Sequence, residues 1–541
     1  MDTKLAQIVK ELFDIDVEIK LTRPDAQFGD YASNVALQLA KPLSKSPRAI
    51  AEEIANSLRA SGDFDAVTIA GPGFINLTVS TQSLLDELEH HPQKSRSGES
   101  VVVEVNNPNP FKDLHIGHAY NCITADTLAN LLEASGAVTH RVSYHGDVGL
   151  HVGKSMWAIL RYVDGDMSRL DAIPVRERPA FMSRMYVEGA AAYKDDDDAK
   201  QAIEFLTKQS FGFDDVFEQN VYDTCKAWSF SYIDETILRL GSHAAEKRYV
   251  ESDADALGMA TVKSQVGTVF EESDGAIVFP GEKYGLYTNV FVSSRGTGLY
   301  AARDLGLMQL KQRDFHPNKS FIITGDEQKA YFEVVIKAAE LALPELSGVT
   351  KNIPTGTVKL STGKMSSRTG EALNIEWLFE KLHAAASERG EVKDVVIIAA
   401  LRYAFLKVRI GSDIIFDINE ALSIEGNSGP YLQYAHARAR SILGKTAKAS
   451  VRPVELGEAE RLLVSKLGEY SDMATQAMNQ LAPHTLCAYL YELSQVFNRF
   501  YEKSQVVGDA REAERVYIVH AYAETLKRGL TLLGIPAPEQ L

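Results

Sequence analysis

Two segments of the chain carry side chains whose types and spacing could bind phosphates and stabilise developing negative charge. The first is EVNNPNPFKDLHIGHAYN (104–121), in which a short apolar strand is expected to run through a proline-interrupted loop into a helix. His115 and His118 are three residues apart, so a helix places both on one face, where they can donate hydrogen bonds to phosphate oxygens. Gly117 between them would let a nucleotide approach the backbone closely. Two histidines at a helix start are, taken alone, more often incidental than functional.

The second segment, LSTGKMSSRTGE (360–371), has glycines near both ends and a dense set of hydrogen-bond donors between them. Such a loop suits a polyphosphate or a pyrophosphate leaving group, with Lys364 as its principal cation. It is not a Walker loop, because GxxxxGK[ST] is absent. A solvated basic loop is the commoner explanation for a segment of this kind in isolation.

The elements around the first segment predict a parallel sheet. A strand over 101–105, a helix over 116–134 and a strand and turn over 138–149 form a βαβ unit. Strand signals return within 267–293 and at 321–325. At the carboxyl edge of such a sheet, a helix N-terminus offers free N–H groups and a positive dipole to phosphates.

Three parts of the chain differ in pattern. Residues 1–92 read as a small α/β module, and residues 98–380 as the parallel-sheet domain with a helical insertion at about 157–265. Residues 390–541 are a succession of amphipathic helices, which predicts an all-α bundle. The expected fold class is therefore α/β multidomain.

Composition excludes several classes of protein. With 541 residues, 45% hydrophobic and 24% charged, the chain is neither disordered, collagen-like nor a small disulfide scaffold. A net charge of −16 rules out a basic coat over the whole surface, though not a local basic face. The three cysteines are far apart, so a zinc ribbon is not expected and a reducing compartment is. We find no targeting peptide and no apolar run near the roughly 20 residues of a membrane span, and expect a soluble, cytoplasmic protein.

Together, HIGH at 115–118 and KMSSR at 364–368 resemble the class I aminoacyl-tRNA synthetases, whose Rossmann-like catalytic fold carries HIGH in its first half and KMSKS in its second. Here Ser367 replaces the second lysine and Arg368 follows, a departure that is frequent in arginyl-tRNA synthetases. The resemblance to that family extends over nearly the whole chain. Its further segments are FGDYASNVALQLAK (28–41), YHGDVGLHVGK (144–154), LYAARDLG (299–306) and FDINEALSIEGNSGPYLQYAHARARSIL (416–443).

The resemblance implies a pocket for arginine. Its residues would be Glu104, Asn109, Tyr300, Asp304 and Gln328. A guanidinium favours planar, bidentate carboxylate partners, and the i, i+4 spacing of Tyr300 and Asp304 puts both on one helical face. On the residues alone, Glu104 could be an edge-strand surface charge, and Asp304 could pair with Arg303 or Lys311.

The resemblance also implies the reaction and its ATP site. The arginine carboxylate attacks the α-phosphorus of ATP to give arginyl-adenylate and pyrophosphate, and the 2′-hydroxyl of the terminal adenosine of tRNA(Arg) then accepts arginine. His115, His118 and Lys364 would be catalytic, and Mg²⁺ would enter with ATP without a metal site of the protein's own. The implied ATP-binding residues are Gly117, His118, Met365, Ser366, Ser367 and Arg368.

Two regions are expected to contact tRNA. Phe28 and Tyr31 of the N-terminal module would meet the tRNA elbow, and Tyr434 and Arg438 of the helical tail would read unstacked anticodon bases. A second aromatic group in the tail has helical spacing and is better explained as core. Its members are Tyr489, Tyr491, Phe497, Phe500 and Tyr501. We expect a monomer.

Other functions remain compatible with parts of this pattern. A HIGH-type nucleotidyltransferase for a small metabolite would need no RNA-reading tail. A catalytically silent tRNA-binding paralogue predicts damage at HIGH, Lys364 or Glu104, and none is visible. Among sister synthetases, pocket acids fit lysine as well as arginine but disfavour glutamate, and missing zinc ligands weaken the case for cysteine.

Overall fold

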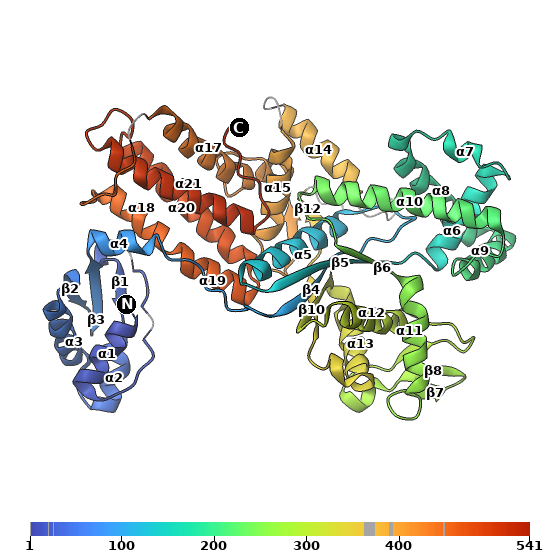
Figure 1. Ribbon diagram of the computed structural model, residues 1–541, viewed down its shortest axis with the longest axis horizontal. Helices are drawn as coiled ribbons and strands as arrows, with labels where there is room; N and C mark the ends of the chain where they lie inside the picture. The colour runs from blue at the N-terminus through green and yellow to red at the C-terminus, as the bar shows by residue number, and fades with distance from the viewer. Residues whose placement is uncertain (1, 20, 25, 362–373, 389–392, 447–448) are drawn as a thin grey trace.

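The computed structural model in Figure 1 has three parts: an N-terminal module, a domain built on a central parallel sheet, and a helical C-terminal tail. The structure describes residues 2–19, 21–24, 26–361, 374–388, 393–446 and 449–541. The N-terminal module lies at one end, next to the helices of the C-terminal tail, and a helical segment extends to the other end. None of the helices within the described ranges combines the length and apolar character that a membrane crossing requires.

The N-terminal module is a small antiparallel sheet packed against helices. Its elements are α1 (Asp2–Phe13), η1 (Ala26–Phe28), β1 (Tyr31–Ser33), α2 (Val35–Leu43), α3 (Pro47–Ser61), β2 (Phe64–Ala70), β3 (Phe74–Val79) and α4 (Thr81–Glu87). The strand order is β1-β3-β2, and Leu77 of β3 lies opposite both Tyr31 and Val67. Ser46 caps α3 by accepting a hydrogen bond from the Ala49 N–H, and Pro47 suits the first helical position. The predicted α/β module is confirmed.

Five parallel strands form the central sheet, in the order β11-β10-β4-β5-β6. They are β4 (Ser100–Asn106), β5 (Val138–His145), β6 (Lys247–Val250), β10 (Lys319–Gly325) and β11 (Thr350–Thr355). The central strand β4 carries Val101, Val102 and Val103, all fully buried, as a strand covered on both faces requires. The predicted parallel sheet is confirmed.

Helices cover both faces of this sheet. They are α5 (Ile116–Ala134) on one face and α11 (Glu251–Ser264), α12 (Tyr300–Phe315) and α13 (Lys329–Ala342) on the other (Figure 1). From β4 the chain adds β5 and β6 on one side and later β10 and β11 on the other. The strand order therefore reverses between β4 and β10, which is where open α/β sheets bind ligands.

A helical segment separates β5 from β6. Its elements are α6 (Leu150–Val163), α7 (Ser168–Asp171), η2 (Val175–Glu177), α8 (Arg178–Asp195), α9 (Asp197–Gln209) and α10 (Val216–Arg239). The insertion expected at about 157–265 ends earlier than that, because β6 pairs with β5, Val142 lying opposite Lys247. A strand of only four residues is too short to stand out between two helical patterns.

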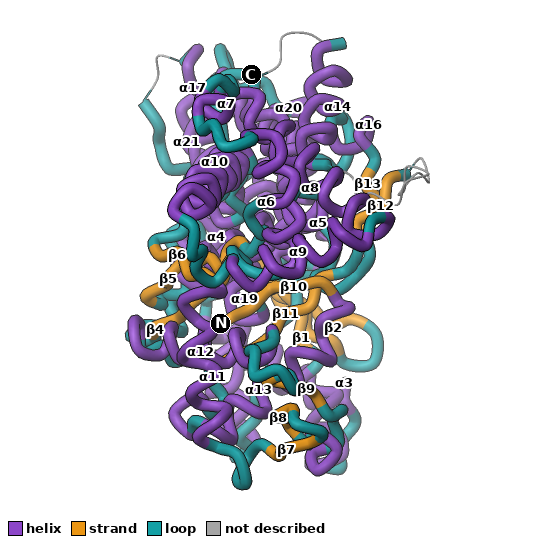
Figure 2. Tube along the Cα trace, turned by 90° about the vertical axis from the view of Figure 1, so that its right-hand side faces the viewer, coloured by secondary structure: helices purple, strands orange, loops and turns teal. Residues whose placement is uncertain are grey.

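Smaller elements complete the sheet domain. They are β7 (Glu271–Ser273), β8 (Ala276–Phe279), η3 (Gly281–Tyr284), β9 (Asn289–Val292), η4 (Asp326–Gln328), η5 (Pro344–Leu346), β12 (Val358–Leu360) and β13 (Ile414–Phe416). β7, β8 and β9 form an antiparallel sheet, which Figure 2 shows on the side of the central sheet away from the tail. β12 and β13 pair in parallel.

The C-terminal tail is a helical bundle, as predicted. Its helices are α14 (Ile375–Ser387), α15 (Asp394–Leu406), α16 (Ile418–Ala421), α17 (Gly429–Lys445), α18 (Glu458–Gly468), α19 (Tyr470–Gln480), α20 (Pro483–Lys503) and α21 (Glu512–Leu532). One hydrophobic core joins this bundle to α5: it contains Ile116 and Ile123 of α5 together with Leu401 of α15 and Leu526 of α21.

Arg402 of α15 is fully buried at the junction between the tail and α5. It donates hydrogen bonds to Asp126 Oδ2 at 2.9 Å and Thr127 Oγ1 at 3.1 Å on α5. It also donates to the carbonyls of Gly241 and Leu533, both at 3.0 Å. A buried guanidinium with these partners joins α5, the end of the helical segment and the end of the chain.

Candidate functional site

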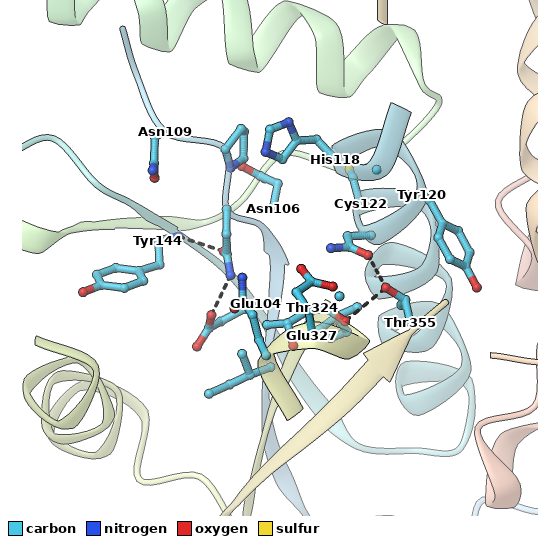
Figure 3. A pocket seen from close by; sticks show the side chains of 18 of the residues that line it. Glu104, Asn106, Asn109, His118, Tyr120, Cys122, Tyr144, Thr324, Glu327 and Thr355 are labelled. Atoms are coloured by element: carbon cyan, nitrogen blue, oxygen red, sulfur yellow. Dashed lines mark hydrogen bonds between the residues drawn. The ribbon is translucent and has the colours of Figure 1, made fainter. Parts of the chain in front are cut away.

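A cavity of about 660 Å³ opens at the carboxyl ends of β4 and β10. Its wall is built by the end of β4 and the loop after it, the first turns of α5 and α12, and η4 after β10. Figure 3 shows Glu104 and His118 on opposite sides of a shared space, with Glu327 and Thr355 near α5. The cavity thus lies at the point where the strand order reverses.

The structure brings predicted residues from both halves of the sheet domain together in this cavity. Those that line it are Glu104, Asn109, His115, Gly117, His118, Tyr300, Asp304 and Gln328. Lys364, Met365, Ser366, Ser367 and Arg368 lie outside the described residues. The role of the second motif in binding ATP therefore stays a prediction.

The two histidines form a stacked pair at the start of α5. Their ring centroids are 3.6 Å apart with an interplanar angle of 28°. The backbone N–H of His115 donates to His118 Nδ1 at 3.1 Å, which leaves the proton of a neutral His118 ring on Nε2. A Cβ on Gly117 would lie 3.0 Å from His115 Nδ1, so the glycine keeps this stack possible.

Both imidazoles are held neutral. Burial, followed by the proximity of His115 and Lys112, lowers the pKa of His118 to about 3. Burial is also the main cause that lowers the pKa of His115. Near neutral pH the pair therefore offers N–H donors and carries no positive charge.

Glu104 is a central, buried carboxylate with 2% of its surface exposed, which excludes an edge-strand surface charge. Lys311 Nζ lies 2.6 Å from its Oε1, and Asn107 Nδ2 donates to its Oε2 at 2.8 Å (Figure 3 draws the second bond). Lys311 thus pairs with Glu104 and not with Asp304. The pair fixes the Glu104 carboxylate at one wall of the cavity.

Asp304 lies one helical turn after Tyr300 on α12 and accepts a hydrogen bond from the Tyr331 hydroxyl at 2.5 Å. Its neighbour Arg303 does not neutralise it, because the Arg303 guanidinium donates to Glu251 at 2.7 Å and to Asp255 at 3.0 Å. Burial raises the pKa of Asp304 to about 7. In the described part of the chain no salt bridge joins Asp304 to a cation, in contrast to Glu104 and Glu251.

Sequence reasoning missed Glu251 and Tyr144 as cavity residues. Glu251 begins α11 directly after β6, and it was assigned to the helical insertion because β6 went unrecognised. The Tyr144 hydroxyl, at the end of β5, is buried without a hydrogen-bond partner among the described atoms. A strand followed at once by an acid was the signal that could have found Glu251.

Lys112 is a third residue near the site that the sequence did not single out. It precedes His115 by three residues, and burial, then the nearby Lys154, lowers the pKa of its ammonium. No salt bridge joins Lys112 to a carboxylate within the described ranges. Its Nζ stands 5.7 Å from the centroid of the Tyr186 ring, and its charge contributes to the lowered pKa of both histidines.

The two predicted RNA-contacting residues of the N-terminal module differ in their surroundings. Phe28 is 44% exposed. Tyr31 is partly buried: Arg23 stacks on its ring at 4.5 Å, and its hydroxyl bonds to Arg23 and Glu87. The geometry leaves Phe28, but not the Tyr31 hydroxyl, available to a partner.

An aromatic and cationic cluster lies on the surface of the tail. The Arg438 guanidinium stands 4.7 Å above the ring of Tyr434 and 5.5 Å above that of Tyr501, and both rings are about two-fifths exposed. Arg438 also donates to Asn498 Oδ1 at 3.0 Å. By contrast, Tyr489, Phe497 and Phe500 are buried in the core. The cluster has the composition of a base-stacking surface.

Models of known families match three consecutive parts of the chain. The arginyl tRNA synthetase N terminal domain matches residues 1–79, the catalytic domain of tRNA synthetases class I (R) matches residues 80–418, and the DALR anticodon binding domain matches residues 432–541. The catalytic model alone spans more than half of the chain and contains every described residue of the cavity.

Relatives of similar length carry one name. An arginine–tRNA ligase of Clostridium acetobutylicum is 29% identical over 591 residues, covering 100% of both chains. One of Shewanella baltica is 28% identical over 575 residues, covering 99% of this chain and 97% of the relative. The Thermus thermophilus arginyl-tRNA synthetase structure matches with a TM-score of 0.79 at 24% identity, covering 100% of this chain and 99% of that one. The Plasmodium falciparum arginyl-tRNA synthetase structure matches with a TM-score of 0.77 at 19% identity, covering 100% of this chain and 98% of that one. At these identities the two structures support the fold.

Proposed function

Because the chain belongs to the arginyl-tRNA synthetases of class I, we propose that its cavity activates arginine with ATP and transfers it to tRNA(Arg). The observation that carries this proposal is the cavity itself: it joins Glu104 and Asp304 on one side to the neutral histidine pair on another. The acids suit a cationic side chain, and the histidine N–H groups suit a nucleotide phosphate. The matched catalytic model is that of the arginine class, which disfavours a sister enzyme for lysine or glutamate.

Asp304 is the first partner for the guanidinium in this proposal. Since it lacks a cation of its own, a bound guanidinium would supply one and gain two charge-assisted hydrogen bonds. Glu104 keeps its salt bridge with Lys311, and its oxygens can accept further hydrogen bonds from the guanidinium. Tyr300, Asn109 and Gln328 line the same cavity and would orient the rest of the amino acid.

Activation needs positioning and charge stabilisation more than a protein nucleophile. The arginine carboxylate oxygen would bond to the α-phosphorus while the bond to the bridging oxygen of pyrophosphate breaks. The His115 and His118 N–H groups would stabilise oxygens that gain charge, and Lys112 adds a nearby cation. We assign Lys364 to the leaving pyrophosphate and Gly117, Met365, Ser366, Ser367 and Arg368 to ATP.

Mg²⁺ enters this proposal as a companion of ATP. In the described ranges no group of three or more His, Cys, Asp or Glu side chains could hold a metal ion. Phosphate oxygens and water would therefore carry most of its coordination, which suits the reluctance of Mg²⁺ to give up water.

The second step would transfer arginine to the 2′-hydroxyl of the terminal adenosine of tRNA. We propose that Tyr434 and Arg438 contact anticodon bases and that Phe28 contacts the elbow. We keep 1–92, 98–380 and 390–541 as the functional parts and propose a monomer in the cytoplasm. The three cysteines are free and buried, in keeping with a reducing compartment.

Arginine should bind more tightly as pH rises. Because burial raises the pKa of Asp304 to about 7, the carboxyl is mostly protonated at lower pH and cannot pair with a guanidinium. The ionised fraction grows about tenfold between roughly pH 6 and pH 8, so the affinity should rise by about that factor. Calorimetric titration with arginine in buffers of different ionisation enthalpy measures both the affinity and the released proton. A flat profile would remove Asp304 from the pocket assignment.

The activity is tested by ATP–pyrophosphate exchange with each of the twenty amino acids, with and without tRNA. We expect exchange with arginine alone among them. Exchange driven by lysine or glutamate would overturn the substrate assignment. Binding of tRNA without any exchange would favour the catalytically silent paralogue.

A further inference from the structure

The N-terminal module is joined to the tail by polar contacts that centre on the Gly29-Asp30-Tyr31 turn. In Figure 1 the module lies below α18, with α4 beside that helix. Asp30 accepts a hydrogen bond from Arg461 of α18, and Tyr31 accepts one from Arg23, which in turn contacts α18. The proposed RNA contact of Phe28 and Tyr31 does not account for these interdomain contacts.

Asp30 is 7% exposed and bonds in two directions. Its Oδ2 accepts from the Val79 N–H of its own module at 2.9 Å and from Arg461 Nη2 of α18 at 2.5 Å. The same Arg461 nitrogen donates to the Val79 carbonyl at 2.6 Å. One guanidinium from the tail thus binds the start of β1 and the end of β3 together.

Tyr31 takes part in a second set of contacts. Its hydroxyl donates to Glu87 of α4, and Arg23 donates to Glu87 Oε2 at 2.7 Å and to Ser465 Oγ of α18 at 3.1 Å. A Cβ on Gly468, the last residue of α18, would lie 2.6 Å from Glu87 Oε2. Glycine at position 468 therefore leaves room for the Glu87 carboxylate at the end of the helix.

Charged contacts continue along the chain that leads out of the module. Arg452 pairs with Asp86 and, at 3.0 Å, with Glu89. Farther on, the Gln93 N–H donates to Thr475 Oγ1 at 3.0 Å and Ser95 Oγ donates to Asn479 Oδ1 at 2.6 Å. The connection to the sheet domain is fixed on the tail as well.

We propose that the Gly29-Asp30-Tyr31 turn is an interdomain clamp, which holds the N-terminal module at one position on α18. The proposal rests on the proposed tRNA function for its consequence. Phe28 on the module and the Tyr434–Arg438 pair on the tail are then two RNA-binding surfaces at a fixed separation. Rigid linkage of two sites raises the effective concentration of the second once the first is bound.

The test replaces Arg461 by methionine and Asp30 by asparagine and measures two dissociation constants. One probe is the full-length tRNA(Arg) transcript and the other is its anticodon stem-loop alone. Loss of the clamp should raise the dissociation constant for full-length tRNA by about tenfold and change the dissociation constant for the stem-loop by no more than about twofold. Arginine-dependent exchange at saturating tRNA should keep its kcat. Arg59→Met is the matched control, because the hydrogen bonds of Arg59 to described residues go to Val67 O and Asn56 Oδ1, both inside the module.

Limited trypsin digestion gives a readout that needs no RNA. Lys94 and Arg96 lie in the connection, and the clamp variants should be cut there several-fold faster than Arg59→Met. Equal weakening of both RNA probes, or unchanged tRNA affinity and digestion, would overturn the clamp. Failure of the unmodified protein to bind tRNA would instead overturn the proposed function.

Discussion

Replacing Asp304 by asparagine should raise the KM for arginine by about 100-fold, which is within the range found when one partner of a buried, hydrogen-bonded charge pair is removed. Asparagine keeps the size of the side chain and can still accept the Tyr331 hydrogen bond. What it lacks is the charge that a guanidinium requires. The KM for ATP should change by no more than about threefold, because the histidine pair and its surroundings stay intact. Steady-state exchange kinetics with each substrate varied in turn give both values.

Tyr331→Phe is the control for this substitution. It removes the hydroxyl that bonds to Asp304 but keeps the carboxylate. Since that hydrogen bond opposes the rise in the pKa of Asp304, its loss should move the pH dependence of arginine binding upward and leave the affinity at high pH nearly unchanged. Equal rises in the KM values for arginine and ATP in Asp304→Asn would sink the pocket assignment.

Replacing His118 by asparagine should lower kcat by about 100- to 1000-fold, the range found when one donor to a developing oxyanion is lost. The asparagine Oδ1 can take the place of Nδ1 and accept from the His115 N–H, so the start of α5 is preserved. No donor then remains at the position of Nε2. The KM for arginine should stay within about threefold, because the donor acts in the transition state.

His118→Gln provides the opposite test, since its amide reaches the position of Nε2 but not that of Nδ1. It should retain more activity than asparagine if the donor is what matters. If glutamine is the worse variant, the role of His118 is to cap α5. In the unmodified protein kcat should show no titration of His118 between about pH 6 and pH 8, because its pKa is about 3.

The sheet and the position of a site at its edge could be predicted from local signals, whereas the residues of the arginine pocket were assigned by the resemblance to the synthetases. Val101, Val102 and Val103 of β4 form an apolar run, and polar residues begin at Glu104, at the edge where parallel strands bind ligands. Tyr300 and Asp304 share a helix, so their spacing alone placed them on one face. Each of these inferences uses neighbours within a few residues.

What could not be predicted depends on partners far away in the chain. Lys311 and Glu104 are 207 residues apart, and either could have been a surface charge. We predicted an RNA contact for Tyr31 because its neighbours in the sequence do not show that its hydroxyl bonds to Glu87, which also pairs with an arginine. The end of the insertion was misplaced because β6 gains its identity from pairing with β5 and not from its own four residues.

The helix that begins with the histidine pair has almost no face left for water. Its residues from Ile116 to Leu132 pack against strands on one side and against α15, α19 and α21 on the other. Arg402 of α15 is hydrogen-bonded to Asp126 at this interface. A polypeptide that ends after the sheet domain would expose the face of this helix that packs on the tail, and Asp126 would lose the buried guanidinium of Arg402. The bundle thus supports the helix that carries the histidine pair, in addition to its proposed contact with RNA. We therefore expect that a fragment ending at residue 390 does not fold into a stable catalytic domain.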